Sequence, residues 1–272
     1  MRSSYALLIL VLAALPAIGA EDDNKWTTIK GQVVIPDAAP IPARKPIVAT
    51  KDQEVAAKDK DFNSEEIIVS AKSRGIKNVV VWLAPEPTAA EMASLKSGKL
   101  KDFPSFKAAD VNPILAKPEK SYVEIDQPCC RFLPHYVLAR EGQDMRIKNS
   151  APIPHNAKWV SRKNGDINPL LPSLSEHVIK NLQAEKFPIE ISCSIHPWMK
   201  AWVRVFDHPY FALSDEDGKF EIKLAPSAKP LRLFVFHESA GFNGGSAGRF
   251  GQVITVKPMT ADLGKIVYEG SK

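Results

Sequence analysis

Short apolar runs separated by prolines and polar turns dominate the hydrophobic pattern of this chain. Apolar and polar residues alternate from Trp26 to Ile35, which predicts a half-buried strand. The run from Asn78 to Leu83 is apolar enough to be a strand that is buried on both faces. Ala89 to Leu95 predicts one short helix, whereas residues 101–120 predict irregular structure. The pattern therefore predicts an all-β fold.

The same kind of pattern continues to the end of the chain. The acidic segment Asp215–Gly218 predicts a hairpin turn between two strands that run from Tyr210 to Ile222. Residues 36–46 hold four prolines and predict a loop. Further strands are expected at Glu66–Val69, Tyr122–Ile125, Lys186–Ile191, Ala201–Phe206, Leu231–His237, Val253–Val256 and Ile266–Tyr268.

Residues 1–20 have the pattern of a secretory signal peptide. Arg2 precedes an apolar run from Tyr5 to Leu15, which is followed by Pro16 and by small residues that end at Ala20. The run is too short to span a bilayer, and no later run is long enough to do so. We therefore expect a periplasmic or secreted protein without an integral membrane segment.

Composition and charge narrow the range of partners. Hydrophobic residues make up 44% and charged residues 25% of the chain, as in a globular protein. The formal net charge is +5, but no cluster of Lys and Arg forms a nucleic-acid-binding stripe. We expect no nucleic acid as partner, and the oligomeric state is left open.

Candidate metal chemistry is concentrated in one short segment. Cys193, His196 and Met199 follow each other at a C-x2-H-x2-M spacing. A thiolate, two imidazoles and a weak axial thioether form the ligand set of a blue-copper electron-transfer site. His155 is the upstream candidate for the second imidazole. The spacing therefore predicts copper as the cofactor.

This part of the chain resembles the plastocyanin and amicyanin branch of the cupredoxins. The resemblance rests on the F-x-P motif Phe132–Pro134, a turn at Gly142, a strand that ends at Asn149, and the P-H-N motif Pro154–Asn156. It implies that residues 118–206 form a Greek-key β-sandwich with one copper ion on the four ligands above. It also implies an electron carrier rather than an enzyme.

The resemblance implies roles for residues around the ligands. Asn149 and Asn156 are expected to brace the ligand-bearing loops by side-chain hydrogen bonds, although both could be ordinary turn residues. His196 is expected to be the electron exit, within an apolar patch that includes Trp198. A redox partner protein is expected to dock there, although Trp198 could equally belong to the core.

Ile195 departs from the resembling family, which has proline at this position of the loop. Because Ile195 keeps a backbone N–H that proline lacks, we expect this N–H to donate a hydrogen bond to the sulfur of Cys193.

Cys129 and Cys130 allow several interpretations. Adjacent cysteines form only a strained disulfide. Cys130 and His135 could be half of a second metal site, or the two cysteines could be plain thiols beside a strand.

The flanking residues resemble a carboxypeptidase regulatory-like (transthyretin-like) β-sandwich. The D-x-D-G-x-F-x-I run Asp215–Ile222 carries this resemblance, and two matching strands lie far upstream at Gly31–Val33 and Val79–Val81. It implies a discontinuous sandwich of residues 21–117 and 207–272 with the cupredoxin-like domain inserted. The alternative is consecutive pieces without a shared sheet.

Electron transfer by a mononuclear copper centre is the leading hypothesis. Copper oxidases and nitrite reductases need His-rich motifs such as H-x-H, and the sequence has none. The dinuclear centre of cytochrome oxidase needs two cysteines in its ligand loop, and this loop has one. The remaining alternative is a module for copper binding or storage, or for envelope binding, without redox shuttling.

Overall fold

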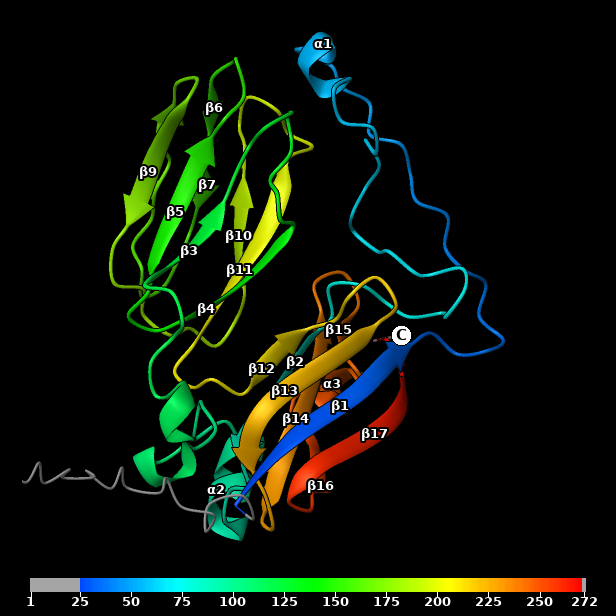
Figure 1. Cartoon of the computed structure of the whole chain (residues 1–272), viewed down its shortest axis with the longest axis vertical. Helices are drawn as coiled ribbons and strands as arrows, with labels where there is room; N and C mark the ends of the chain where they lie inside the picture. The colour runs from blue at the N-terminus through cyan, green and yellow to red at the C-terminus, as the bar shows by residue number, and fades with distance from the viewer. Residues whose placement is uncertain (1–24, 271–272) are drawn as a thin grey trace, which may run out of the picture.

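The computed structural model describes residues 25–270, so the expected signal peptide lies outside the described part of the chain. Nearly all regular structure is β, which confirms the predicted fold class. Two β-sandwiches are stacked, and a long loop from one of them reaches along the other (Figure 1). Within residues 25–270, no helix is both long and apolar enough to cross a membrane.

Residues 122–206 form the first unit, which we call the central sandwich. Its sheets have the strand orders β4-β11-β10-β7 and β3-β5-β9, with a separate β6-β8 pair. In β5, side chains alternate between partly and fully buried, and Met145 and Ile147 point into the core between the sheets. The strands are β3 (Tyr122–Ile125), β4 (Tyr136–Arg140), β5 (Asp144–Asn149), β6 (His155–Asn156), β7 (Lys158–Trp159), β8 (Leu170–Leu171), β9 (Ser175–Ile179), β10 (Ile189–Ser192) and β11 (Lys200–Phe206).

The second unit, the flanking sandwich, combines strands from both ends of the chain. Its sheets have the orders β13-β1-β17 and β12-β2-β14-β15, with β16 on β14. Neither β1 nor β2 pairs with any strand of residues 122–206. The strands are β1 (Trp26–Val34), β2 (Val80–Pro85), β12 (Phe211–Leu213), β13 (Lys219–Pro226), β14 (Pro230–His237), β15 (Gly241–Phe242), β16 (Gln252–Thr255) and β17 (Met259–Val267).

Helical structure is confined to short segments. In α2 (Ala89–Lys96), the expected helix, the side chain of Thr88 accepts a hydrogen bond from the Glu91 N–H in a capping box. The others are α1 (Gln53–Ala56), α3 (Gly245–Gly248) and the 3-10 turns η1 (Ala108–Asp110) and η2 (Pro113–Leu115).

Strand β2 is buried on both faces, as its apolar run predicted. Val81 and Leu83 pack into the core of the flanking sandwich. Val80 and Trp82 face the other way, into a cluster that includes Phe206 of β11. The Trp82 ring lies 6.0 Å from the Phe206 ring, between centroids. The second face of β2 therefore joins the two sandwiches.

Two local predictions were wrong. Residues 66–69 form no strand and contribute only an isolated bridge between Val69 and Ile76. The acidic turn exists, because the Gly218 N–H donates to the Asp215 carbonyl at 3.0 Å. Its two strands, however, belong to different sheets, since β12 pairs with β2 and β13 pairs with β1.

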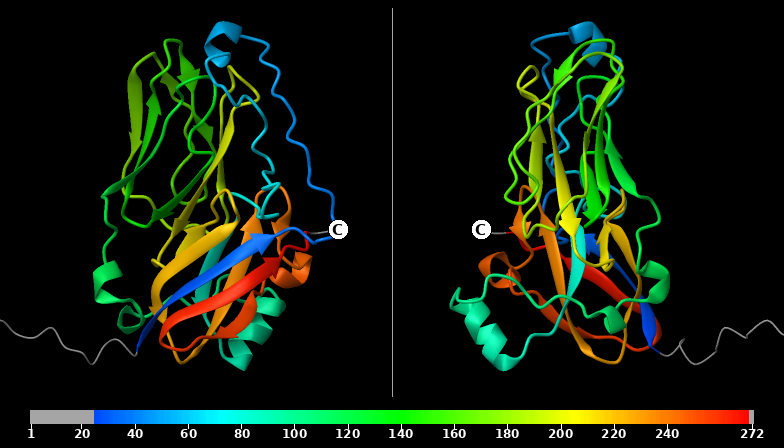
Figure 2. Two further views of the ribbon diagram at one scale, coloured as in Figure 1. Left: turned by 45° about the vertical axis from the view of Figure 1, so that its right-hand side comes forward. Right: turned by 90° about the vertical axis from the view of Figure 1, so that its left-hand side faces the viewer.

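Residues 36–78, which we call the arm, leave the end of β1 and return to β2. They run alongside the central sandwich and place α1 at its far end (Figures 1 and 2). Arg131 of the central sandwich holds the arm, with ion pairs to Asp59 at 2.6 Å and Glu65 at 2.5 Å. These side chains are at most 14% exposed. Ion pairs shielded in this way depend on both partners, because loss of one leaves a buried charge.

Gly218 lies close to the backbone of Val33 in β1, and its replacement tests that contact. Its φ is +76°, and an added Cβ would lie 2.2 Å from the Val33 carbonyl oxygen. Gly98 has a similar φ of +74°, with no atom within 4 Å of an added Cβ. We expect Gly98→Ala to cost about 1 kcal/mol for the left-handed conformation. Gly218→Ala should cost about 1–3 kcal/mol more, because the backbone must move.

Urea unfolding of the two variants measures the difference in the free energy of unfolding. Equal losses in both variants would contradict the close approach of Val33 to Gly218.

Candidate metal centre

Two histidines from distant parts of the sequence lie side by side at one end of the central sandwich. His155 is in β6, and His196 is in the loop between β10 and β11. Their ring centroids are 4.8 Å apart, and both side chains are 0% exposed. The structure thus brings together the two imidazoles that the sequence proposed as metal ligands.

Asn149 determines which nitrogen of His155 is free. The Asn149 amide nitrogen donates to the carbonyls of Ile153, Leu171 and Pro172 at 2.9–3.0 Å. The other end of the amide is therefore the oxygen, and it lies 3.0 Å from Nδ1 of His155. Nδ1 must carry the proton that it donates to this oxygen, which leaves a lone pair on Nε2.

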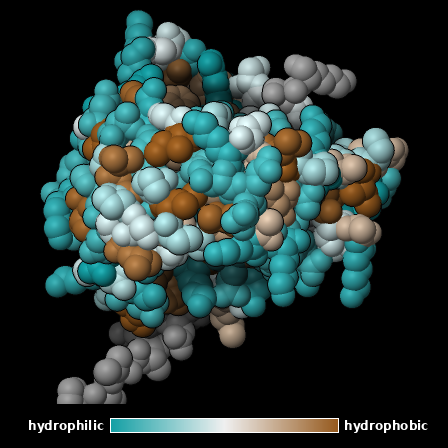
Figure 3. Space-filling view, turned by 90° about the horizontal axis from the view of Figure 1, so that it is seen from above, coloured by the Kyte–Doolittle hydropathy of each residue, from teal (hydrophilic) through white to brown (hydrophobic). Residues whose placement is uncertain are grey.

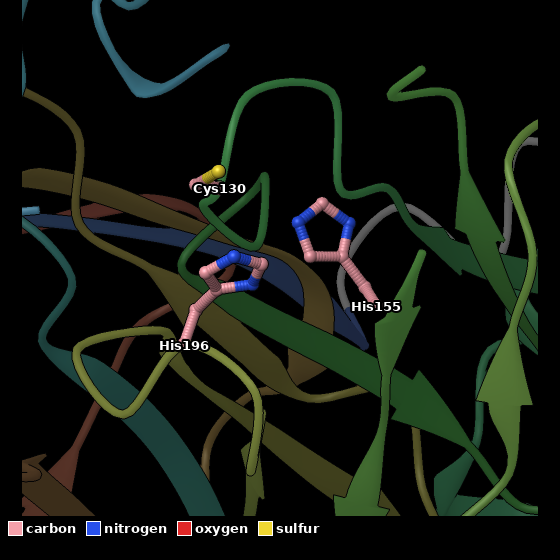
Figure 4. A group of neighbouring side chains, drawn as sticks. All are labelled: Cys130, His155 and His196. Carbon is pink, nitrogen blue, oxygen red and sulfur yellow. The ribbon is translucent and has the colours of Figure 1, made fainter. Parts of the chain in front are cut away.

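Within residues 25–270, Nε2 of His155 has no hydrogen-bond partner, although it is buried. One ring nitrogen of His155 points toward Cys130 and His196 (Figure 4). Burial, followed by the neighbouring His196, lowers the pKa of His155 to about 4. The ring is therefore neutral near pH 7. A neutral, buried imidazole with an unused lone pair is the form that binds a metal ion.

The side chain of Cys193 faces His196. Its Sγ lies 3.8 Å from Nδ1 of His196, and its side chain is buried. A metal ion at about 2.3 Å from sulfur and 2.0 Å from nitrogen would separate the two donors by roughly 3.5–3.8 Å at tetrahedral to trigonal angles. The residues present therefore fit a bound ion between Cys193 and His196.

The ligand loop is closed by its own backbone. The Cys193 N–H donates to the Met199 carbonyl at 3.2 Å, and the Met199 N–H donates to the His196 carbonyl at 2.9 Å. Met199 is 1% exposed and packs in the same core cluster as Cys193. The spacing C-x2-H-x2-M thus corresponds to the loop between β10 and β11, which holds all three side chains inside the protein.

Asn156 links the two ligand-bearing segments. Its Oδ1 accepts hydrogen bonds from the backbone N–H groups of Ser194 at 2.7 Å and Ile195 at 3.3 Å. It also accepts one from the thiol of Cys193 at 3.2 Å. The expected bond from the Ile195 N–H to sulfur is therefore wrong, because the Asn156 oxygen takes this donor.

Cys130 is a residue that the sequence did not connect with this centre. One ligand atom each of Cys130, His155 and His196 forms a group in which all three atoms lie within 4.8 Å of one another. Cys130 is 0% exposed and Cys129 partly exposed, and both are free thiols. The chain separates Cys130 from the ligand loop by seven strands, β4 to β10, and their connections, so spacing gave no signal for it.

His135 has other partners. Its Nε2 lies 2.6 Å from Glu238, and its Nδ1 lies 3.8 Å from Glu65. Both ring nitrogens thus face carboxylates, and these contacts give no support to a second metal site made of Cys130 and His135.

The arm covers the ligand loop. The Asp52 carboxylate lies 2.8 Å from Nε2 of His196. The rings of Phe62 and Trp198 meet edge to face, 6.4 Å apart. The Trp198 indole N–H donates to the Cys130 carbonyl at 3.1 Å. His196, the expected electron exit, is therefore not exposed to solvent in the described structure.

A cavity of about 540 Å³ lies between the arm and the central sandwich, and Trp198 and Met199 form part of its wall. Arg131 and Glu65 line it as well. On the face seen from above, apolar side chains form separate patches among hydrophilic ones (Figure 3).

The sequence matches no protein-family model and no curated protein. Among solved structures it is similar to the copper-containing nitrite reductase of Thermus scotoductus SA-01, at 20% identity and a TM-score of 0.29, over 31% of this chain and 22% of that one. A purple cupredoxin of Nitrosopumilus maritimus is 20% identical, at a TM-score of 0.27, over 31% of this chain and 99% of that one. An amicyanin mutant in its Cu(I) form is 18% identical, at a TM-score of 0.29, over 37% and 90%.

Removal of the Asn149 side chain tests its structural role in the metal-free protein. Asn149→Ala leaves three carbonyls and the His155 ring without their partner, so we expect a loss of about 2–4 kcal/mol in the free energy of unfolding. Asn63→Ala is the control, because its side chain bonds only to the exposed Asp61 at 2.8 Å. That change should cost less than about 0.5 kcal/mol. Urea unfolding that shows similar losses in both would contradict the role of Asn149.

Proposed function

We propose that this chain is an exported mononuclear blue-copper protein that transfers electrons. His155, Cys193 and His196 would hold the copper ion, with Met199 as the weak axial ligand. The observation that carries the proposal is the unpartnered, buried Nε2 of His155, close to a His196 ring that faces the Cys193 sulfur at 3.8 Å.

The donor set and its rigidity suit this function. Copper supplies a one-electron change, and soft thiolate and imidazole ligands bind both of its oxidation states. The protein's part is to keep the ligands in place and exclude water. Hydrogen bonds of Asn149 and Asn156 fix the two segments, and all four ligands are at most 3% exposed. Little rearrangement should then accompany the change of charge.

We further propose a division into two domains, with residues 118–206 inserted between residues 21–117 and 207–272 of a second sandwich. The pairing of β1 with β13 and β17 supports this division. A redox partner would dock near His196 and Trp198, where the arm would form part of the docking surface. The leader pattern of residues 1–20 supports export to the periplasm or the outside of the cell.

Titration of the purified chain with Cu(II) tests the proposal. We expect an intense visible charge-transfer band that saturates near one copper per chain and disappears on reduction. Cys193→Ser should weaken and shift the band, because the Cys193 thiolate contributes to it. Cys129→Ser is the matched control and should retain it. Copper binding without the band would refute the carrier and favour storage.

Asp52 offers a test of the arm's influence on the centre. A carboxylate next to His196 stabilises the more positive Cu(II) state, so Asp52→Asn should raise the reduction potential. We expect a shift of about 1 kcal/mol, or roughly 40 mV for a one-electron couple. Glu54→Gln removes an exposed charge from the same helix and should leave the potential nearly unchanged. Voltammetry showing equal shifts in both would contradict a specific role of Asp52.

A further inference from the structure

Cys130 lies where a metal ligand would lie. Its side chain is fully buried, and its sulfur belongs to the group with His155 and His196 whose ligand atoms are all within 4.8 Å of one another. Figure 4 shows Cys130 above the His196 ring, and the three side chains surround a common space. The independent sign of a ligand here is the buried Nε2 of His155, which has no partner among the described residues and points into that space.

The backbone at Cys130 is held in an unfavourable conformation. Its φ is +56°, a value that side chains with a Cβ rarely adopt. The carbonyl of Cys130 accepts the indole N–H of Trp198, which lies in the ligand loop between His196 and Met199. Strain of this kind persists only where surrounding contacts enforce it, and it concentrates at functional sites. Here the enforcing contact comes from the ligand loop itself.

We propose that Cys130 is a second thiolate ligand of the copper centre, so that Cu(I) is held by two cysteine sulfurs together with the histidines. This inference rests on the copper centre proposed above. Thiolate sulfur is the softest donor that a protein offers, and soft donors select Cu(I). On binding, the Cys130 thiol loses its proton to solvent as its sulfur bonds to the metal, with no change in oxidation state.

A purely structural thiol would behave differently. A buried cysteine that only fills space acts as a small hydrophobic residue. Its replacement by serine would change the stability of the metal-free protein but not its preference for copper. The two roles therefore separate when metal affinity is measured independently of stability.

Cu(I) affinity, measured by competition with a chromogenic Cu(I) chelator, separates the two roles. We expect Cys130→Ser to bind Cu(I) at least about tenfold more weakly than the wild type, as loss of a ligand requires. Cys129→Ser removes the adjacent, partly exposed thiol and should bind like the wild type. Circular dichroism of the copper-free variants verifies that they fold. An unchanged Cu(I) affinity in folded Cys130→Ser would overturn the proposal.

X-ray absorption at the copper edge of the Cu(I)-loaded wild type needs no substitution. We expect two short copper–sulfur distances, and a single one would overturn the assignment of Cys130. If the proposed copper centre itself were wrong, the wild type would show neither a visible band with Cu(II) nor tight binding of Cu(I). That result differs from a wrong assignment of Cys130 alone.

Discussion

The hydrogen bond between Asn149 and His155 is the constraint on which the centre depends. Three carbonyls fix the direction of the Asn149 amide, and its oxygen then fixes the proton on Nδ1 of His155. Burial, followed by the neighbouring His196, lowers the pKa of His155 and keeps the ring neutral. In this neutral ring, the proton on Nδ1 leaves a lone pair on Nε2. Without the amide, the ring could turn and either nitrogen could face the interior. The proposed ligand His155 is therefore oriented without a metal ion, by an amide at the end of β5, whose Met145 and Ile147 side chains lie in the core.

The flanking sandwich, through the arm, contributes side chains to the surroundings of this centre. The arm places a carboxylate on His196 and an aromatic ring on Trp198. Since β2 packs one face against Phe206 and the other against its own core, the arm starts from a unit that is firmly attached to the central sandwich. The environment of His196 is thus built by residues about 144 positions apart in the chain. Without the arm, the central sandwich would leave Nε2 of His196 facing water.

Sequence reasoning found the elements that local patterns encode, and it proposed candidate ligands from the same kind of signal. The apolar run of β2 and the tight loop of Cys193–Met199 could be predicted because their signals lie within a few residues. The separation of β12 from β13 could not, since a turn motif does not say which sheets its strands join. Cys130 and Asp52 were missed for a similar reason. Each reaches the centre only through tertiary packing, and no spacing rule relates either one to His196.

Burial of the centre from two sides bears on the proposed electron transfer. A direct contact between a partner and the His196 ring is not possible in this arrangement, because the side chain is 0% exposed. Its Nε2 already contacts Asp52, whose side chain is 40% exposed. Trp198 packs on the same ring, with centroids 5.2 Å apart, and is itself partly exposed. One carboxylate and one indole therefore connect the buried ring with the surface, so the arm would belong to the proposed docking surface.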